Sequence, residues 1–378
     1  MRTHPSTPRP LRWALLALAS ALCAWSLVGC TGTVSSSLPI DIVVSDQGSS
    51  GGPQLQTIST QAIDPSSSSY DPSAAIQTLP LNQPPVGLAN APDGQTLYVG
   101  FPDTIALYND ALQQTGSISL PSGCSLQSFS INGAGTWLAG LLQCSGQPQL
   151  WVTSLSNPAT LYQQGSPNAF SFSVSSGGGP GALPYAIGDS ALYFVTGSPA
   201  GGGTTLFQTV QLPISNNSSP LVNSNGTALT SAANDLSSYQ GQGVVATDSA
   251  VSAVSAGQLG SSLIPSGAQR IFRGYGISVL AAFSVSSTTG VAQLSFLSPN
   301  GSATLSSNNL GTSPLPGSIA AMTFTPDGYA WFFDPQGNLW RVDVSVLHGS
   351  VLSTAVRTTS LPIYGVNGLA WLTESAAP

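Results

Sequence analysis

The chain has 378 residues, of which 6% are charged, and its 14 acidic side chains outnumber seven basic ones. It contains no lysine, and its formal net charge of −7 excludes the basic surface that nucleic-acid binding requires. Because charge is this sparse, serine, threonine, asparagine, glutamine and backbone groups must keep the surface hydrated.

The N-terminus has the organisation of an export signal. Three arginines precede or interrupt the start of an apolar run that extends over residues 11–28. The run after Arg12 is shorter than the roughly 20 residues that a membrane-spanning helix needs. We therefore expect residues 1–29 to be a signal peptide.

The end of this run, Leu27-Val28-Gly29-Cys30, resembles the lipobox of bacterial lipoproteins. The resemblance implies cleavage before Cys30, lipid on its sulfur, and a membrane anchor in the cell envelope. The second residue after cleavage would be Thr31 and not aspartate, which favours the outer membrane if the host has one. In a host without an outer membrane, we expect the anchor on the outer face of the cytoplasmic membrane. The alternative is an uncleaved apolar anchor that ends in an incidental cysteine. Cleavage would leave four basic against 14 acidic residues, a formal charge of −10.

Residues 30–54 are rich in serine and glycine and are interpreted as the lipidated cysteine followed by a flexible tether. Within the tether, residues 38–44 could form a strand, although Pro39 argues for a sheet edge. Residues 55–60 and 75–79 are further strand candidates. From residue 55 to residue 378 every apolar run is short and bounded by glycine, proline, asparagine or serine, which predicts an all-β domain.

Two segments repeat one pattern of strand, Pro-Asp-Gly turn, aromatic strand, turn and strand. The first covers residues 86–108 with the turn at Pro92-Asp93-Gly94, and the second begins at residue 320 with the turn at Pro326-Asp327-Gly328. These units resemble blades of a β-propeller of the YVTN and WD40-like repeat families. The resemblance implies a closed ring of repeats.

Blade starts near residues 86, 127, 184, 241, 269, 319 and 366 predict seven blades, with six or eight as alternatives. Residues 366–372 match an inner strand with nothing after it to complete a blade. Propellers commonly close by pairing both ends of the chain, which removes exposed edges. We expect strands before Leu81, residues 55–60 and 75–79, to complete this blade.

The two cysteines of the second unit flank a hairpin. Asn132-Gly133 marks its turn, and a hairpin centred at Ala134 places Cys124 opposite Cys144. A disulfide between them suits an oxidising compartment. Two thiols or a metal pair are the alternatives, although a zinc site would lack further ligands.

Catalytic side chains are scarce after residue 29, where His348 is the one histidine and Glu374 the one glutamate. A Ser-His-Asp triad would have to use His348. Asp93, Asp189 and Asp327 recur at the turns and are interpreted as turn formers rather than calcium ligands. We therefore expect no enzyme activity, no cofactor and no metal site. A propeller enzyme of the lactonase or lyase type is the minor alternative.

The leading hypothesis is a monomeric, lipid-anchored scaffold for protein–protein interaction in the envelope, similar to outer-membrane assembly propeller lipoproteins. The alternative is a surface protein that binds polysaccharide or peptidoglycan. That reading would use Trp151, Trp331, Trp340 and Trp371 as exposed sugar platforms, so four buried rings would count against it.

Overall fold

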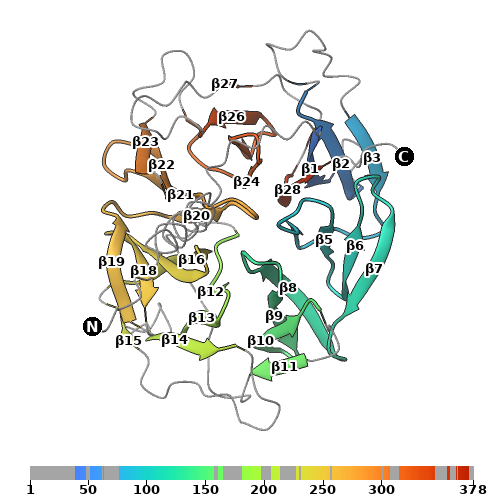
Figure 1. Ribbon diagram of the computed structural model, residues 1–378, viewed down its shortest axis with the longest axis horizontal. Coiled ribbons are helices and arrows are strands. Elements are labelled where there is room, and N and C mark those ends of the chain that lie inside the picture. Colours follow the sequence, from blue (N-terminus) through green and yellow to red (C-terminus); the bar gives the residue numbers. More distant parts are fainter. Residues whose placement is uncertain are drawn as a thin grey trace, which may run out of the picture.

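The computed structural model describes residues 39–47, 52–61, 63, 76–156, 161–164, 181–196, 206–212, 227–229, 231–255, 258–299, 301–306, 315–344, 356–357, 363 and 365–373. These residues form seven antiparallel sheets of four strands each, arranged in a ring (Figure 1). The protein is an all-β propeller, as the sequence predicts. The number of described sheets equals the number of blades expected from the sequence. None of the residues described here forms a helix that could cross a membrane.

Six of the seven sheets are built from consecutive strands. In order from the inner strand outwards they are β4 (Gly87–Asn90), β5 (Leu97–Gly100), β6 (Thr104–Tyr108) and β7 (Gln114–Ser119); β8 (Cys124–Ile131), β9 (Trp137–Cys144), β10 (Gln147–Ser154) and β11 (Leu161–Gln164); β12 (Tyr185–Ile187), β13 (Ala191–Thr196), β14 (Leu206–Gln211) and β15 (Thr227–Ala228); β16 (Ala233–Tyr239), β17 (Gln242–Thr247), β18 (Val251–Ser255) and β19 (Gln258–Ile264); β20 (Arg270–Arg273), β21 (Leu280–Val285), β22 (Ala292–Ser298) and β23 (Gly301–Ser306); β24 (Ala321–Phe324), β25 (Tyr329–Phe333), β26 (Leu339–Asp343) and β27 (Val356–Arg357).

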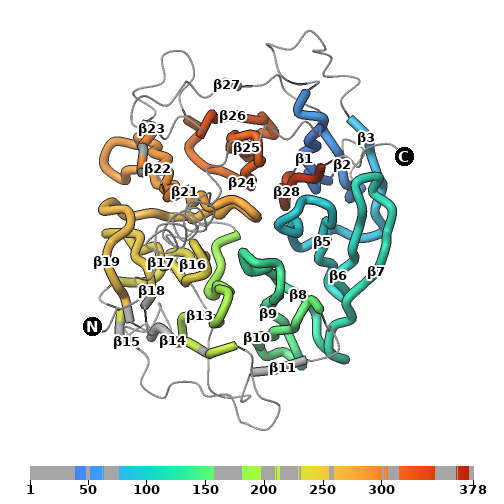
Figure 2. Tube along the Cα trace, in the orientation of Figure 1, coloured from blue at the N-terminus to red at the C-terminus, as the bar shows by residue number. Residues whose placement is uncertain are grey.

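The seventh sheet joins the two ends of the chain. Its order is β28 (Gly368–Thr373), β1 (Ile40–Asp46), β2 (Gln54–Ser59) and β3 (Ile76–Pro80). Figure 2 shows the red C-terminal strand beside the blue N-terminal strands. The predicted closure of the ring by N- and C-terminal strands is therefore confirmed.

The direct partner of β28 differs from the expectation. β1 pairs with β28 over six residues, for example Ile42 with Trp371, whereas the expected partners β2 and β3 are the third and fourth strands. Residues 40–46 thus belong to the sheet and not to a tether that runs to residue 54. Pro39 comes just before the strand, where it breaks no ladder hydrogen bond, and the strand's apolar side chains are buried.

One predicted blade start is shifted by a strand. The sequence indicates a start near residue 241, but the inner strand of that sheet is β16, and β17 lies next to it. The hydrophobicity of the sequence does not indicate β16, because this strand buries polar side chains: Asn234 is 1% exposed and Asp235 is 2% exposed. Polar residues can take inner positions when partners from neighbouring strands satisfy them.

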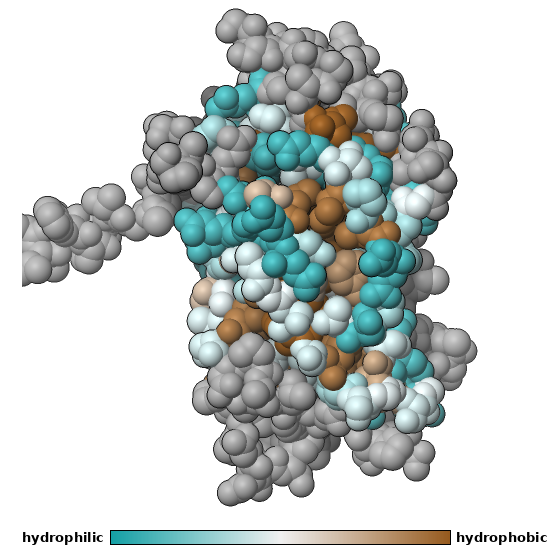
Figure 3. Space-filling view, turned by 90° about the vertical axis from the view of Figure 1, so that its right-hand side faces the viewer, coloured by the Kyte–Doolittle hydropathy of each residue, from teal (hydrophilic) through white to brown (hydrophobic). Residues whose placement is uncertain are grey.

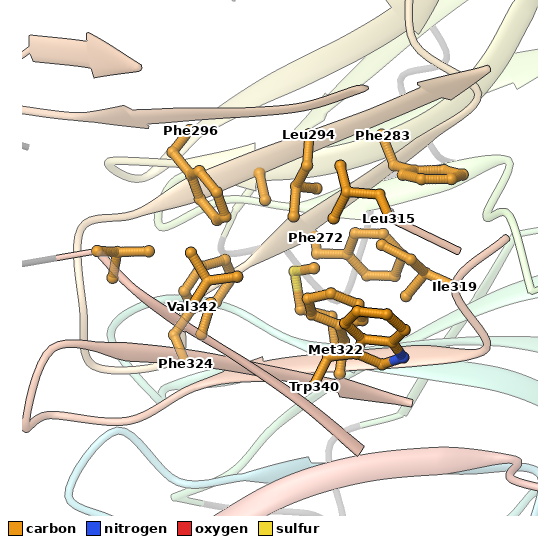
Figure 4. Packing of buried hydrophobic residues seen from close by; sticks show 14 of the residues in the cluster. Phe272, Phe283, Leu294, Phe296, Leu315, Ile319, Met322, Phe324, Trp340 and Val342 are labelled. Atoms are coloured by element: carbon orange, nitrogen blue, oxygen red, sulfur yellow. The ribbon is translucent and has the colours of Figure 1, made fainter. Parts of the chain in front are cut away.

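The core lies between neighbouring sheets. Figure 4 shows the packing between sheet β20–β23 and sheet β24–β27, where Phe272, Leu294 and Phe296 face Met322, Phe324 and Trp340. Phe296 and Phe324 meet edge to face at 6.3 Å between ring centroids. Such interdigitation fixes each blade against the next, so the ring is a rigid frame for its centre.

The outer rim of the ring is a mixed surface. Figure 3 looks onto the side of the molecule that carries β3 and β7, and apolar patches there alternate with hydrophilic ones. On β3 the polar Gln77 and Thr78 are exposed, while Ile76 and Leu79 pack against the adjoining core clusters. The outermost strand thus turns its polar side chains to solvent.

Candidate binding site at the centre of the ring

The structure describes some of the predicted site residues and not others. Cys30 and His348 lie outside the described residues. Cys124 and Cys144 form the predicted disulfide, which joins β8 and β9. The expected hairpin symmetry holds at the cysteines because the register shifts by one residue between Leu126 and Ser128, which brings Cys124 opposite Cys144.

The four tryptophans proposed as sugar platforms are buried. Trp151 is 0%, Trp331 1%, Trp340 5% and Trp371 2% exposed. Their indole rings fill the contacts between sheets and offer no surface on which a sugar could stack. The polysaccharide hypothesis therefore loses the side chains on which it was built.

The turn aspartates have structural roles. Asp93 accepts the backbone N–H of Gln95 at 3.0 Å within its own turn. Asp189 instead reaches the preceding sheet, where it accepts hydrogen bonds from Asn132 Nδ2 at 2.9 Å and from the Ala134 N–H at 3.3 Å. In the described part of the chain no three His, Cys, Asp or Glu side chains are grouped as metal ligands would be.

A cavity of about 400 Å³ opens where the seven inner strands begin. Residues of β4, β8, β12, β16, β20, β24 and β28, or directly preceding them, line it. The ring therefore brings together residues as far apart in the chain as Val86 and Leu369, 283 positions. Its size falls in the range of about 300 to 1,000 Å³ that is typical of small-molecule sites.

A second cavity, of about 570 Å³, lies at the opposite ends of several inner strands. Its lining includes the turn residues Asp93, Asp189 and Gly241 together with Tyr239. Arg273, the last residue of β20, lines both cavities. Arg273 is therefore in contact with both cavities of the central space.

The Arg273 guanidinium links three other inner strands to β20. One terminal nitrogen donates hydrogen bonds to the Ile187 carbonyl at 3.3 Å and to the Ser238 hydroxyl. The other donates to Ser130 Oγ at 3.0 Å. The guanidinium also lies 4.5 Å from the centre of the Tyr275 ring, within cation–π range.

The cavity wall holds a second arginine, which is paired with a carboxylate. Arg270 Nε lies 3.3 Å from Asp235 Oδ2, which also accepts the Ile271 N–H at 2.9 Å. The other carboxylate oxygen accepts the Leu183 N–H at 2.8 Å. Burial raises the pKa of Asp235 to about 6, and the nearby Arg270 and the backbone donors oppose that rise.

A hydroxyl pair adds to the polar part of the cavity, to which Gln127, Ser237 and Asn367 also belong. Tyr185 Oη and Ser128 Oγ lie 3.2 Å apart, and burial raises the pKa of this fully buried phenol above its usual value. Apolar side chains make up much of the remaining wall. They come from five inner strands and retain small exposures: Phe129 8%, Phe272 7%, Met322 8% and Leu369 6%, with Leu88 half-buried.

Sequence reasoning missed Arg270 and Arg273 as site residues, although it predicted the strand that carries them. A compositional signal was present. Outside residues 1–29 the chain has four arginines, and two of them stand three positions apart on one inner strand. In the folded ring both side chains line the central cavity.

No protein-family model and no curated protein sequence matches this chain. The solved structures similar to it include a functionally unknown protein from Desulfotomaculum acetoxidans DSM 771, with a TM-score of 0.52, 11% identity and coverage of 88% of this chain and 98% of that one. Apo AztD from Citrobacter koseri has a TM-score of 0.48 at 11% identity, with 85% of this chain and 83% of that chain covered. TolB from Acinetobacter baumannii has a TM-score of 0.41 at 14% identity, with 79% of this chain and 69% of that chain covered. At such identities the likeness concerns the fold alone.

Proposed function

We propose that this protein is a lipid-anchored β-propeller of the cell envelope that acts as a non-enzymatic scaffold for protein–protein interaction. The observation that carries the proposal is the lipobox-like Leu27-Val28-Gly29-Cys30 directly ahead of a propeller. A signal of this kind delivers a folded domain to a membrane surface and holds it there by acyl chains.

The position of β1 sets how far the propeller would stand from the membrane. Cys30 is ten residues before Ile40, the first residue of β1. A fully extended chain of ten residues spans at most about 35 Å. The tether is therefore shorter than the 30–54 segment expected from sequence, and the ring would work close to the lipid surface.

A rigid ring with turns on both faces suits a scaffold. The turns after the inner strands, such as 91–96 and 240–241, lie on one face, and the turns between the second and third strands, such as 334–338, lie on the other. Gln95 and Gln240 are exposed on the first face, and Gln336 and Thr288 on the second. Contacts with partner proteins would use one of these faces.

Site-specific photo-crosslinking tests the proposal. A photoreactive amino acid is placed singly at Gln95, Gln240, Thr288 or Gln336 of the full chain in its host. We expect a defined crosslinked protein from positions on one face and none from the other. Palmitate labelling should mark the chain at Cys30.

The matched control is Cys30→Ser carrying the same photoreactive positions. We expect this variant to lose the lipid label, to leave the membrane fraction and to lose the crosslink, because the partner meets the ring only at the membrane. Absence of a crosslink from all four positions would overturn the scaffold role. An unlabelled chain in the soluble fraction would overturn the anchor.

A further inference from the structure

The cavity at the start of the inner strands carries positive charge in an acidic protein. Arg270 and Arg273 both line it, whereas the chain as a whole has twice as many acidic as basic residues and no lysine. The Arg270 charge is balanced by Asp235 at 3.3 Å. Arg273 is bonded to neutral oxygens, so within the described part of the chain its charge has no carboxylate partner.

The guanidinium of Arg273 has N–H donors left for a ligand. Arginine has five N–H donors, and the hydrogen bonds to Ile187, Ser238 and Ser130 use three of them. Those bonds fix the plane of the guanidinium, since they come from three different inner strands. A preorganised guanidinium is suited to a carboxylate, which it can bind through two parallel hydrogen bonds.

Apolar side chains form a large part of the remaining wall. Phe129, Phe272, Met322 and Leu369 reach the cavity from four different inner strands and are each 6–8% exposed. A mainly apolar cavity of about 400 Å³ with a few convergent polar groups has the general form of a small-molecule site. An inorganic anion would leave most of that apolar wall in contact with water.

We propose that this cavity binds a small organic anion, with a carboxylate on Arg273 and an apolar body against Phe129, Phe272, Met322 and Leu369. This inference goes beyond the scaffold role and does not depend on it. The competing explanation is that Arg273 only ties inner strands together, in which case the cavity has no preference for an anion.

Phenylacetate and phenylacetamide provide the matched probes, because they share one ring and differ in the charged carboxylate. Each is titrated into the full chain labelled with ¹³C-methyl methionine. The chain has two methionines, and Met322 lines the cavity, so Met322→Leu assigns its signal. We expect phenylacetate to shift the Met322 methyl signal saturably, with a Kd at least tenfold below that of phenylacetamide.

Two variants locate the charge that matters. Arg273→Gln should remove the preference for the acid over the amide. Arg341→Gln is the control, because Arg341 stacks over Tyr329 and Trp331 away from the cavity, and it should keep that preference. If Arg273→Gln fails to fold, the wild-type chain still tests the proposal. The preference for the acid over the amide then tests the charge, and nuclear Overhauser contacts between the phenyl protons and the Met322 methyl test whether the ligand lies in the cavity.

The proposal is overturned by any of three results. Phenylacetate that gives no saturable shift, or that binds no better than the amide, removes the anion site. An Arg273→Gln variant that folds and keeps the preference assigns the charge elsewhere. Saturable shifts without any contact between the phenyl protons and Met322 place the ligand outside the cavity.

Discussion

Single polar side chains connect neighbouring blades at the centre of this ring. Asp235 on β16 accepts hydrogen bonds from Leu183, two residues before β12, and from β20, and Asp189 is bonded to the preceding hairpin. Buried carboxylates of this kind are stable only when donors surround them, because an unpaired buried charge is costly. Each such residue therefore couples the geometry of two or three blades.

The raised pKa of Asp235 should make the stability of the folded protein depend on pH. An unfolded aspartate titrates near 3.9, whereas burial raises the folded pKa to about 6. Between these values the folded protein binds more protons than the unfolded chain. The contribution of Asp235 to the free energy of unfolding should therefore be largest below about pH 4 and should decrease as pH rises towards 6, staying low above it.

Urea unfolding between pH 4 and pH 8 measures this dependence. We expect Asp235→Asn to lower stability throughout, because the amide breaks the set of bonds around Arg270, and to remove most of the decline between pH 4 and pH 6. Asp103→Asn, at an exposed aspartate, is the control and should leave the decline in place. A decline of unchanged slope in Asp235→Asn would contradict the assignment.

At the scale of elements, the Pro-Asp-Gly turn between β4 and β5 is also a contact between blades. Gly94 has a φ of 71° and donates its N–H to Ala91 O at 2.9 Å, which closes the turn. Its carbonyl accepts the Thr373 N–H at 2.9 Å, and a Cβ built on Gly94 would overlap the ring of Trp371. The turn thus packs onto β28 of the adjoining sheet.

The substitutions Gly94→Ala and Gly123→Ala distinguish the two constraints on Gly94, which are its positive φ and its close contact with Trp371. Gly123 also has a positive φ, of 75°, but nothing lies within 4 Å of a Cβ built there. Both changes should cost about 1 kcal/mol for the left-handed backbone. Gly94→Ala should cost roughly 1–3 kcal/mol more, since it forces Trp371 to move. Equal losses in denaturant unfolding would show that the contact is unimportant.

At the scale of the whole molecule, closure of the ring depends on one long-range pairing. β28 and β1 pair over residues 40–45 and 368–373, and no covalent link holds them in the described part of the chain. The other six sheets each form from a continuous stretch. The sheet that contains both chain ends is therefore the seam of the ring.

Deleting residues 366–378 should open this seam. β1 would lose its ladder partner, and Trp371 and Leu372 would leave the core, so the loss of stability should far exceed the 0.5–3 kcal/mol typical of a point change. Deleting residues 31–37 is the control and should leave unfolding unchanged, because that segment precedes β1. Thermal unfolding compares the three chains. A truncated chain that melts like the intact one would show that the ring does not depend on this pairing.

The amino-acid sequence by itself determined the local part of this architecture. Short apolar runs between turn residues predicted an all-β chain, Pro-Asp-Gly predicted turns that the structure contains, and the hairpin at Asn132-Gly133 predicted the bond between Cys124 and Cys144. These features depend on residues close together in the chain. The solitary strand at the C-terminus also predicted that the ring closes with the N-terminal segment.

Only the tertiary structure decided which strand closes the ring and what lies at its centre. Strands of similar composition have equivalent hydrogen-bonding edges, so composition could not favour β1 over β2 as the partner of β28. β16 was missed because its buried Asn234 and Asp235 are satisfied by groups up to 52 positions away. The cavity and Arg273 emerge for the same reason, because a ring converts positions far apart in sequence into neighbours around one axis.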